Sequence, residues 1–305
     1  MEKKTPIRLK TINDFHKLWC LPKPEHPLIS VIDYKLINHS LVDSGQSIIL
    51  DYYSIAIKRD LGVKLIYGQE SFDFDEGLMF FMAPNQVLRV EKEERNRIDH
   101  DGWILLIHPD FLWNTPLAKT IKKYEYFNYA MHEALFLSEK EEATIINLIG
   151  NIQQEYHANI DKYSQNIIIS QTETLLNYAE RFYQRQFITR RITNHKILES
   201  LEVLLDAYFT NEVAGKGLPS VASIAERLNI SPGYMSSMLK TLTGQSAQQH
   251  IQNKIIEIAK AKLSTTNHSV SEIAYALGFE HSQSFNKFFK TKTKVSPLEF
   301  RVSFN

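Results

Sequence analysis

The chain has little cysteine and no net charge. Its 305 residues include one cysteine, Cys20, which excludes an internal disulfide and any zinc site built from several cysteines. Lys plus Arg and Asp plus Glu each number 35, so the formal net charge is zero. The chain as a whole has no excess positive charge to attract nucleic acid, and any basic region must be balanced by an acidic one.

The sequence also lacks the signals of a membrane protein, a secreted protein or a common class of enzyme. It has no apolar run long enough to span a bilayer and no basic-then-apolar leader. It contains neither a glycine-rich phosphate loop nor a Gly-X-Ser-X-Gly elbow. His39, His100, His108 and His132 are scattered, and no His-X-His pair occurs, so the metal site of a cupin enzyme is not expected. We expect a soluble, cytoplasmic protein without a metal or cofactor.

One short pattern occurs twice in the last third of the chain. Val221 to Ile230 reads VASIAERLNI, and Val270 to Phe279 reads VSEIAYALGF, 49 residues later (270 − 221). In both copies an Ile-Ala pair and the following Leu recur at helical spacing, so they would share one buried face. A second amphipathic stretch follows each copy, YMSSMLKTLTG after the first and SFNKFFKTKTK after the second.

The residues between the two stretches favour a helix-turn-helix. Ser231 suits the N-cap of a helix and Pro232 its first position. In the second copy, Gly278 can take a left-handed backbone conformation at little cost. We therefore predict helix-turn-helix motifs at about 221–243 and 270–293. Two such motifs in one domain could place two helices in successive major grooves of DNA; the alternative is a helical bundle with a duplicated hairpin.

The charge distribution also points to DNA. Residues 218–305 contain ten Lys or Arg and five Asp or Glu, a balance of +5, and the first 217 residues carry 25 − 30 = −5. Lys287, Lys290, Lys292 and Lys294 lie within eight residues on the second predicted recognition helix. Basic surface attracts phosphate by releasing counterions, so we expect DNA affinity to fall steeply with salt.

From about Leu218 to Arg301 the sequence resembles the DNA-binding domain of the AraC/XylS family of bacterial transcription regulators. The residues that carry the resemblance are Ile273-Ala274, Gly278-Phe279, Phe285, Phe289-Lys290, Ser296-Pro297 and Phe300-Arg301. The resemblance implies a sequence-specific regulator that binds double-stranded promoter or operator DNA and is not an enzyme. Three positions depart from the family pattern: Ser237 and Ile255, where the family has Arg, and Lys294, where Gly is usual. The first recognition helix is therefore weakly charged.

Roles follow from the geometry of a helix-turn-helix, in which the N-terminal part of the second helix reaches the base edges. The base-reading candidates are Gly233, Ser236 and Ser237 in the first motif and Ser282, Gln283, Asn286 and Lys287 in the second. The phosphate-contacting candidates are Tyr234, Lys240, Lys290 and Lys292. We assign Met235, Phe285, Phe288 and Phe289 to the core. Arg301 is expected to cap or pair at the end of the domain.

The first part of the chain looks β-rich from about Leu28 to Asp110, with short apolar strands between turn signals. The family resemblance implies a cupin-like barrel here, in which a small-molecule effector binds. By position, the aromatic candidates for effector binding are Tyr34, Tyr52, Tyr53 and Trp103. Each of these is also explained as a core residue.

Between these parts the pattern is helical. Ser138 is an N-cap candidate before an amphipathic stretch, and a second helix is predicted at about Ser164 to Gln186. The resemblance implies that these helices form a homodimer; the alternative is that they only cover the barrel. The stretch from Asn211 to Pro219, NEVAGKGLP, is predicted to be a flexible joint, and the helix from about Asn194 to Phe209 to open the DNA-binding domain.

The sequence therefore predicts an α+β multidomain protein. Residues 1–135 form a β-rich, cupin-like sensor domain, 136–190 a helical dimerisation or connector segment, and 191–305 an all-α DNA-binding domain with two helix-turn-helix motifs. The predicted function is sequence-specific transcription regulation controlled by a small-molecule effector. One alternative is a DNA-binding dimer without an effector, and another is a metal-dependent cupin enzyme fused to a helical domain.

Overall fold

The structure is a computed structural model that describes residues 6–37, 46–59, 66–67, 70–71, 77–89, 101–130, 133–158, 161–189 and 191–303. The chain divides into two units, Met1–Gln186 (unit 1) and Phe187–Asn305 (unit 2). Across the described residues, none of the helices combines the length and the apolar character needed to cross a membrane.

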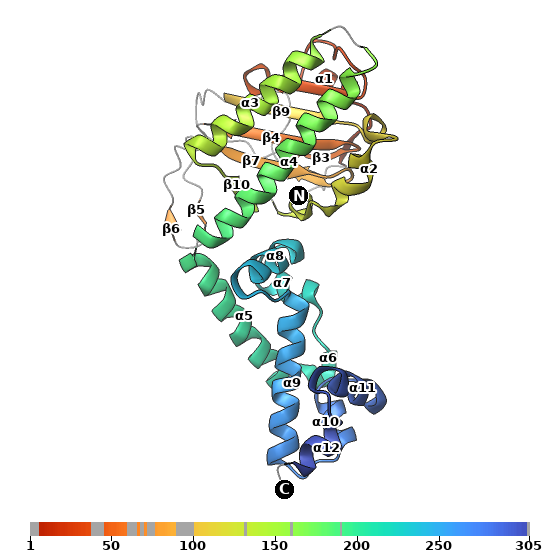
Figure 1. The fold of residues 1–305 in the computed structure, drawn as a ribbon, viewed down its shortest axis with the longest axis vertical. Coiled ribbons are helices and arrows are strands. Elements are labelled where there is room, and N and C mark those ends of the chain that lie inside the picture. Colours follow the sequence, from red (N-terminus) through yellow and green to blue (C-terminus); the bar gives the residue numbers. More distant parts are fainter. Residues whose placement is uncertain are drawn as a thin grey trace. The chain divides into compact units, whose positions relative to one another are not determined.

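Unit 1 is built on a five-stranded sheet with the order β10-β7-β4-β9-β2 (Figure 1). Its strands are β2 Ile29–Asp33, β4 Tyr53–Arg59, β7 Leu78–Met82, β9 Asp101–Ile107 and β10 Leu135–Phe136. The central strand β4 pairs antiparallel with β7 and β9 along its length. Every residue of β9 from Ile104 to Ile107 is buried, as expected for a strand with both faces covered.

A second, three-stranded sheet faces the first. It contains β1 Ile7–Leu9, β3 Ser47–Leu50 and β8 Val87–Arg89 in the order β1-β3-β8, and β5 Ile66–Tyr67 and β6 Glu70–Ser71 form a separate pair. Leu9, Ile48 and Leu50 from this sheet share one hydrophobic core with Ile104 and Leu106 of β9. Over the described residues the sheets remain open, so the predicted cupin-like barrel is not confirmed.

Unit 1 also contains two long helices, α3 Glu139–Tyr156 and most of α4 Ser164–Thr189 (Figure 1). A capping box of Ser138 and Glu141 starts α3, which packs against β2. The α4 backbone accepts a hydrogen bond from the Tyr126 hydroxyl at Leu176. Both helices, up to Gln186, belong to unit 1. Most of the predicted connector at 136–190 therefore lies in unit 1, where α3 contacts β2 and α4 is hydrogen-bonded to Tyr126.

Unit 1 also contains several short helices. They are α1 Ile12–Leu18, α2 Pro116–Thr120 and the 3-10 turns η1 Tyr34–Leu36, η3 Pro109–Leu112, η4 Ile121–Lys123 and η5 Glu125–Asn128.

The described residues of unit 2 form helices joined by short turns (Figure 1). The helices are α5 Arg191–Asn211, α6 Val213–Lys216, α7 Val221–Arg227, α8 Pro232–Thr243, α9 Ala247–Thr265, α10 Val270–Ala276, α11 Ser282–Thr293 and α12 Pro297–Val302. The pair α7–α8 spans the first predicted motif, and the pair α10–α11 spans the second. The linking helix α9 contacts α7 and α8 of the first motif and α10 of the second.

The internal repeat extends into the hydrogen bonds of unit 2. Ser220 and Ser269, 49 residues apart, each form the capping box that starts the first helix of a motif. Thr243 and Thr293, 50 residues apart, each donate a hydrogen bond at 2.8 Å to the carbonyl oxygen four residues earlier. The two motifs thus share their local chemistry as well as their apolar pattern.

The recognition helices also end alike. Gly244 after α8 and Lys294 after α11 both have left-handed backbones, with φ of 75° and 71°. The first position has the glycine that this conformation favours, whereas the second forces a lysine into it.

The predicted flexible joint from Asn211 to Pro219 is wrong in its main feature. Residues 213–216 form α6, and Val213 is only 4% exposed. The Tyr208 hydroxyl donates to the carbonyl oxygen of Gly217 at 3.0 Å. The glycines in this stretch suggested flexibility, but the buried valine and the tyrosine hydrogen bond hold the segment against the domain.

Candidate DNA-binding surface

The buried face of α11 fixes the direction of its outer face. Phe285 and Phe289 are fully buried. Their rings lie 5.7 Å apart, and they contact Phe279 and Phe300 at 5.4 and 5.6 Å respectively. These aromatic contacts hold one side of α11 in the core, so the opposite side faces outward.

That outer side carries most of the candidates from the sequence. Gln283, Asn286, Lys287 and Lys290 are exposed and follow one another at helical spacings of three, one and three residues, so they share one face. Ser282, at the start of the helix, is half-buried. These side chains lie on one helix face and are open to a partner.

The lysines of α11 are free to meet phosphate. Lys287, Lys290 and Lys292 are exposed. In the part of the chain that the structure describes, none of the three forms a salt bridge, whereas Lys254 on α9 pairs with Asp206 at 2.7 Å. A lysine without an ion-pair partner breaks no salt bridge when it binds a phosphate. Helix α11 therefore provides the main basic surface of the two motifs.

The outer face of α8 is smaller and nearly uncharged. Ser231 caps α8 by accepting a hydrogen bond from the backbone N–H of Tyr234. Gly233, Ser236 and Ser237 are half-buried, and Lys240 is exposed. The first motif therefore presents short side chains and one cation where the second presents amide groups and several lysines.

Tyr234 does not belong to this surface. Its side chain is 1% exposed, and its ring lies edge-on to Phe187 at 5.1 Å. The predicted phosphate contact of Tyr234 is therefore wrong, because an aromatic ring packed in the core does not reach the DNA backbone.

Three other side chains lie where the sequence predicted. Met235 is fully buried in the core, and Phe288 is half-buried and lies 5.6 Å from Phe279. Arg301 donates to the carbonyl oxygens of Leu263 and His268 at 3.3 and 2.6 Å. It therefore caps the end of α9, as the sequence predicted, and does not extend toward DNA.

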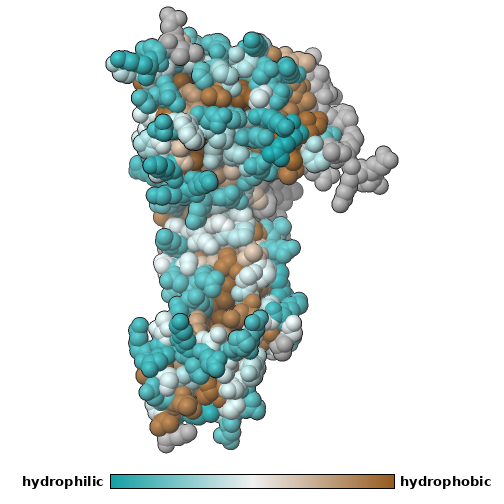
Figure 2. All heavy atoms as spheres, turned by 90° about the vertical axis from the view of Figure 1, so that its right-hand side faces the viewer, coloured by the Kyte–Doolittle hydropathy of each residue, from teal (hydrophilic) through white to brown (hydrophobic). Residues whose placement is uncertain are grey.

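Two exposed side chains next to the recognition helix were not predicted. His281 occupies the N-cap of α11 without capping it, and Tyr275 on α10 is 56% exposed. The repeat could have indicated both residues, because Tyr275 lies just before the turn of the second motif and His281 lies in it. Figure 2 shows that hydrophobic patches also occur on the surface of unit 2.

The four aromatic effector candidates lie mostly in the core of unit 1. Tyr34, Tyr52 and Tyr53 are 6%, 0% and 8% exposed, and Trp103 is half-buried. Burial raises the pKa of the Tyr52 hydroxyl well above its usual range. That hydroxyl has no hydrogen-bond partner among the described residues. Packing between the two sheets explains the positions of Tyr34 and Tyr52 in full.

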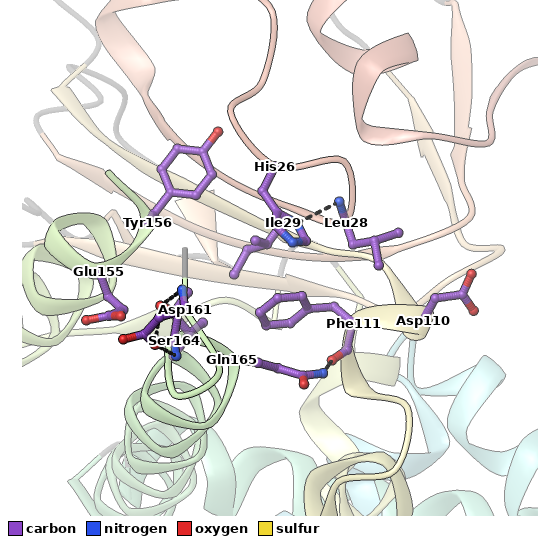
Figure 3. Close-up of a pocket in the computed structure, with 11 residues that line it drawn as sticks. His26, Leu28, Ile29, Asp110, Phe111, Glu155, Tyr156, Asp161, Ser164 and Gln165 are labelled. Carbon is purple, nitrogen blue, oxygen red and sulfur yellow. Dashed lines mark hydrogen bonds between the residues drawn. The ribbon is translucent and has the colours of Figure 1, made fainter. Parts of the chain in front are cut away.

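A pocket of about 310 Å³ lies elsewhere in unit 1 (Figure 3). Its lining is formed by His26, Leu28, Ile29, Asp110, Phe111, Glu155, Tyr156, Asp161, Ser164, Gln165 and Ile168. The backbone N–H of Leu28 donates to Nδ1 of His26, and burial lowers the pKa of this histidine. The lining has three carboxylates and no Lys or Arg, and it includes none of the four aromatic candidates.

No cluster that could hold a metal ion is found among the described residues. His39, His100 and His132 lie outside them, whereas His108 accepts a hydrogen bond from the backbone N–H of Asp110.

Comparison with known proteins also indicates a DNA-binding domain at the C-terminal end of the chain. Residues 224–303 match the family model of a helix-turn-helix domain. The raffinose operon transcriptional regulatory protein RafR of Pediococcus pentosaceus is 32% identical over 111 residues, which cover 36% of this chain and 40% of RafR. The multiple antibiotic resistance protein MarA of Salmonella typhimurium is 31% identical over 116 residues, which cover 38% of this chain and 83% of MarA.

A solved structure is similar to the same region. The C-terminal domain of AraT, a response regulator from Geobacillus stearothermophilus, is 28% identical. The match covers 35% of this chain and 84% of the AraT chain, with a TM-score of 0.32.

The match to RafR spans less than half the length of that protein. The similar proteins are transcription regulators and not enzymes. The second motif resembles the AraC/XylS pattern in sequence, and the match to MarA covers most of that protein. This chain belongs to the AraC/XylS family of transcription regulators.

Proposed function

We propose that the protein controls transcription by contacting two short boxes of promoter DNA, one with each motif, and that α11 contributes most of the sequence reading. The observation that carries this proposal is the exposed row of Gln283, Asn286 and Lys287 on α11. Gln and Asn can bond adenine in bidentate fashion, and Lys can reach the acceptors of guanine. Ser282 adds a hydroxyl at the start of the same helix.

The first motif has a different role in this proposal. Gly233, Ser236 and Ser237 leave α8 without long polar side chains, so its base contacts are short and few. Lys240 in the first motif, and Lys290 and Lys292 in the second, contact phosphate and set the register of the domain on DNA. The first motif therefore positions the domain more than it specifies the sequence.

Selection of genomic DNA fragments by the full-length protein at physiological salt tests the proposal. We expect an enriched motif with two boxes about one helical turn apart, of which the box under α11 is the more constrained. Two equally constrained boxes would contradict the dominance of α11. Fragments that share no motif would contradict sequence-specific reading.

We further propose that a small molecule bound to unit 1 controls this activity. The pocket of Figure 3 has the size and the mixed lining of a ligand site, with Leu28, Ile29, Phe111 and Ile168 as its apolar part. Its carboxylates favour a neutral or cationic ligand over an anionic one. This pocket replaces Tyr34, Tyr52, Tyr53 and Trp103 as the proposed effector site.

Thermal-shift screening of neutral, cationic and anionic small molecules checks the effector proposal. A ligand that binds only the folded protein raises its melting temperature. Glu155→Gln should weaken a cationic ligand, whereas Glu139→Gln, on the exposed start of the same helix, should not. A cationic ligand whose stabilisation is identical in both variants binds elsewhere.

We also propose that the protein is a homodimer and that α4 contributes to the interface. Ile167 in the first turn of α4 is 43% exposed, and Tyr163 directly before the helix is 56% exposed, so apolar side chains meet solvent at the start of α4. Light scattering with Ile167→Lys tests this. A monomeric wild type, or an unaltered dimer in the variant, would exclude this interface.

A further inference from the structure

The chain between α5 and α7 touches both helix-turn-helix motifs. We call residues 212–217 the α5–α6 corner. Glu212 begins it, and the Glu212 carboxylate accepts hydrogen bonds from Arg227 at 2.8 Å and from Lys216 at 2.9 Å. Arg227 lies in the last turn of α7, the first helix of the first motif. The corner is thus tied to the first motif by an ion pair.

The other side of the corner packs against the second motif. The Cα of Gly278, in the turn between α10 and α11, lies so close that an added Cβ would be 2.7 Å from Cγ2 of Val213 and 2.8 Å from the carbonyl carbon of Gly217. Val213 is 4% exposed. The corner therefore meets the turn of the second motif at direct van der Waals contact.

The corner is itself anchored. The Tyr208 hydroxyl on α5 donates to Gly217, and Asp206 on α5 pairs with Lys254 on α9. The covalent connection between the motifs is α9, whose 19 residues make a helix about 28 Å long. Turns at the ends of a helix can absorb changes in φ and ψ, so α9 alone leaves some freedom between α8 and α11. The corner is a second connection that restricts this freedom.

We propose that Glu212 is a positioning residue that sets the spacing at which the two recognition helices fit DNA. The inference rests on the proposed function, in which both motifs contact DNA. Adding one base pair between two boxes shifts the second by about 3.4 Å and turns it by roughly 34° around the duplex. A domain held at two connections rejects that shift, whereas a domain held only by α9 accommodates part of it.

The test measures binding of the full-length protein to duplexes in which the two selected boxes are separated by spacers that differ by one base pair. The readout is the ratio of affinities at the best and the neighbouring spacing. Arg227→Glu places two carboxylates against each other, and we expect this ratio to fall about three- to fivefold. Glu212→Lys/Arg227→Glu restores opposite charges and should restore the ratio. Lys216→Gln leaves the pair with Arg227 in place and should not change it.

The ratio separates positioning from simple loss of affinity or stability. Loss of a phosphate contact at Arg227 lowers affinity at every spacing and leaves the ratio unchanged. Glu212→Gln serves as a milder variant if Arg227→Glu does not fold, with an expected fall of about twofold. An unchanged ratio in the folded variants overturns the role of Glu212 while the two-box function stands. A wild type that binds all spacings equally overturns the two-box function and this inference together.

Discussion

Asn229 and Gly278 occupy the same position in the turns of the two motifs, and both have left-handed backbones, with φ of +56° and +86°. Their surroundings differ. Gly278 lies against Val213 and Gly217 of the α5–α6 corner, so its position requires glycine for conformation and also for space. Asparagine, at the first position, tolerates the left-handed conformation better than most residues.

This difference predicts effects of different size for two substitutions. Gly278→Ala should destabilise unit 2 by roughly 2–4 kcal/mol, because the methyl group meets Val213 in a conformation that alanine disfavours. Asn229→Gly keeps a residue that suits the left-handed conformation and meets no such clash, so it should cost less than Gly278→Ala. Hydrogen exchange of the amides in α10 and α11 measures both effects. Equal effects of the two substitutions would show that the close contact of Gly278 with the α5–α6 corner does not contribute to the stability of unit 2.

The second prediction separates base reading from phosphate contact on α11. Asn286→Ala should relax specificity at one base position and cost about 1–3 kcal/mol on the cognate site. Lys290→Ala should weaken binding to all sequences evenly and reduce the salt slope by about one unit. Titrations of cognate and random duplexes at several salt concentrations measure both.

Ser236→Ala is the matched control for this pair, because Ser236 corresponds to Asn286 in the repeat and lies on the weakly charged α8. We expect it to cost less than Asn286→Ala on the cognate site. Equal losses from Asn286→Ala and Lys290→Ala on both kinds of DNA would exclude the assigned roles.

The third prediction concerns pH. The Nε2 atom of His250 lies 2.9 Å from the hydroxyl of Thr243, and burial lowers the pKa of His250 below 6.5, with Glu202 opposing the shift. The unfolded chain therefore binds this proton more readily than the folded one, so the stability of unit 2 falls as the pH drops below about 6.5. The loss continues until the pH has passed through the lowered pKa.

Hydrogen exchange in α8 and α9 between pH 7.5 and 5.5, corrected for intrinsic rates, measures this loss. His250→Gln keeps a donor near Thr243 and removes the titrating group, so it should flatten the dependence. His281→Gln is the matched control, because it replaces an exposed histidine and leaves His250 and Thr243 in place. If His250→Gln retains the full dependence, another group carries it.

The fourth prediction uses two glycines of unit 1. Gly102 in β9 has φ of +138°, and a Cβ there would lie 2.0 Å from the carbonyl oxygen of Ile57. Gly102→Ala should therefore cost roughly 3 kcal/mol or more. Gly150 lies within α3 with nothing within 4 Å of an added Cβ, so Gly150→Ala should stabilise unit 1 by about 0.5–1 kcal/mol.

Tryptophan fluorescence follows this pair without interference from unit 2, because Trp19, Trp103 and Trp113 all lie in unit 1. A Gly102→Ala protein that unfolds at the wild-type denaturant concentration would contradict the close approach of β9 to β4.

The helices of the two motifs were predictable because their signals are local. Ser231, Pro232 and Gly278 mark the turns, and the apolar spacing around them places the buried faces. The start of α11, the burial of Phe285 and Phe289, and the exposed row on the opposite side all follow from residues within one or two helical turns. The base-reading candidates on α11 are exposed for the same reason.

The incorrect assignments depend on partners far away in the chain. Tyr234 was placed on the DNA side by its position in α8, but it packs on Phe187, and no local pattern reveals that contact. The stretch from Asn211 to Pro219 reads as flexible until Gly278 is brought against it. The pocket of unit 1 combines residues from three separate stretches of the chain, so periodicity gave no sign of it.

The sequence by itself determined the repeated helix-turn-helix motifs, the basic character of the second recognition helix and the family, because caps, turns and apolar periods act over short distances. Only the tertiary structure decided that Tyr234 is buried, that the strands of unit 1 pair into two facing sheets, and that Glu212 and Gly278 bring the α5–α6 corner against both motifs. Those features depend on close packing and on hydrogen bonds between segments distant in sequence, which are specified only when the whole domain has assembled.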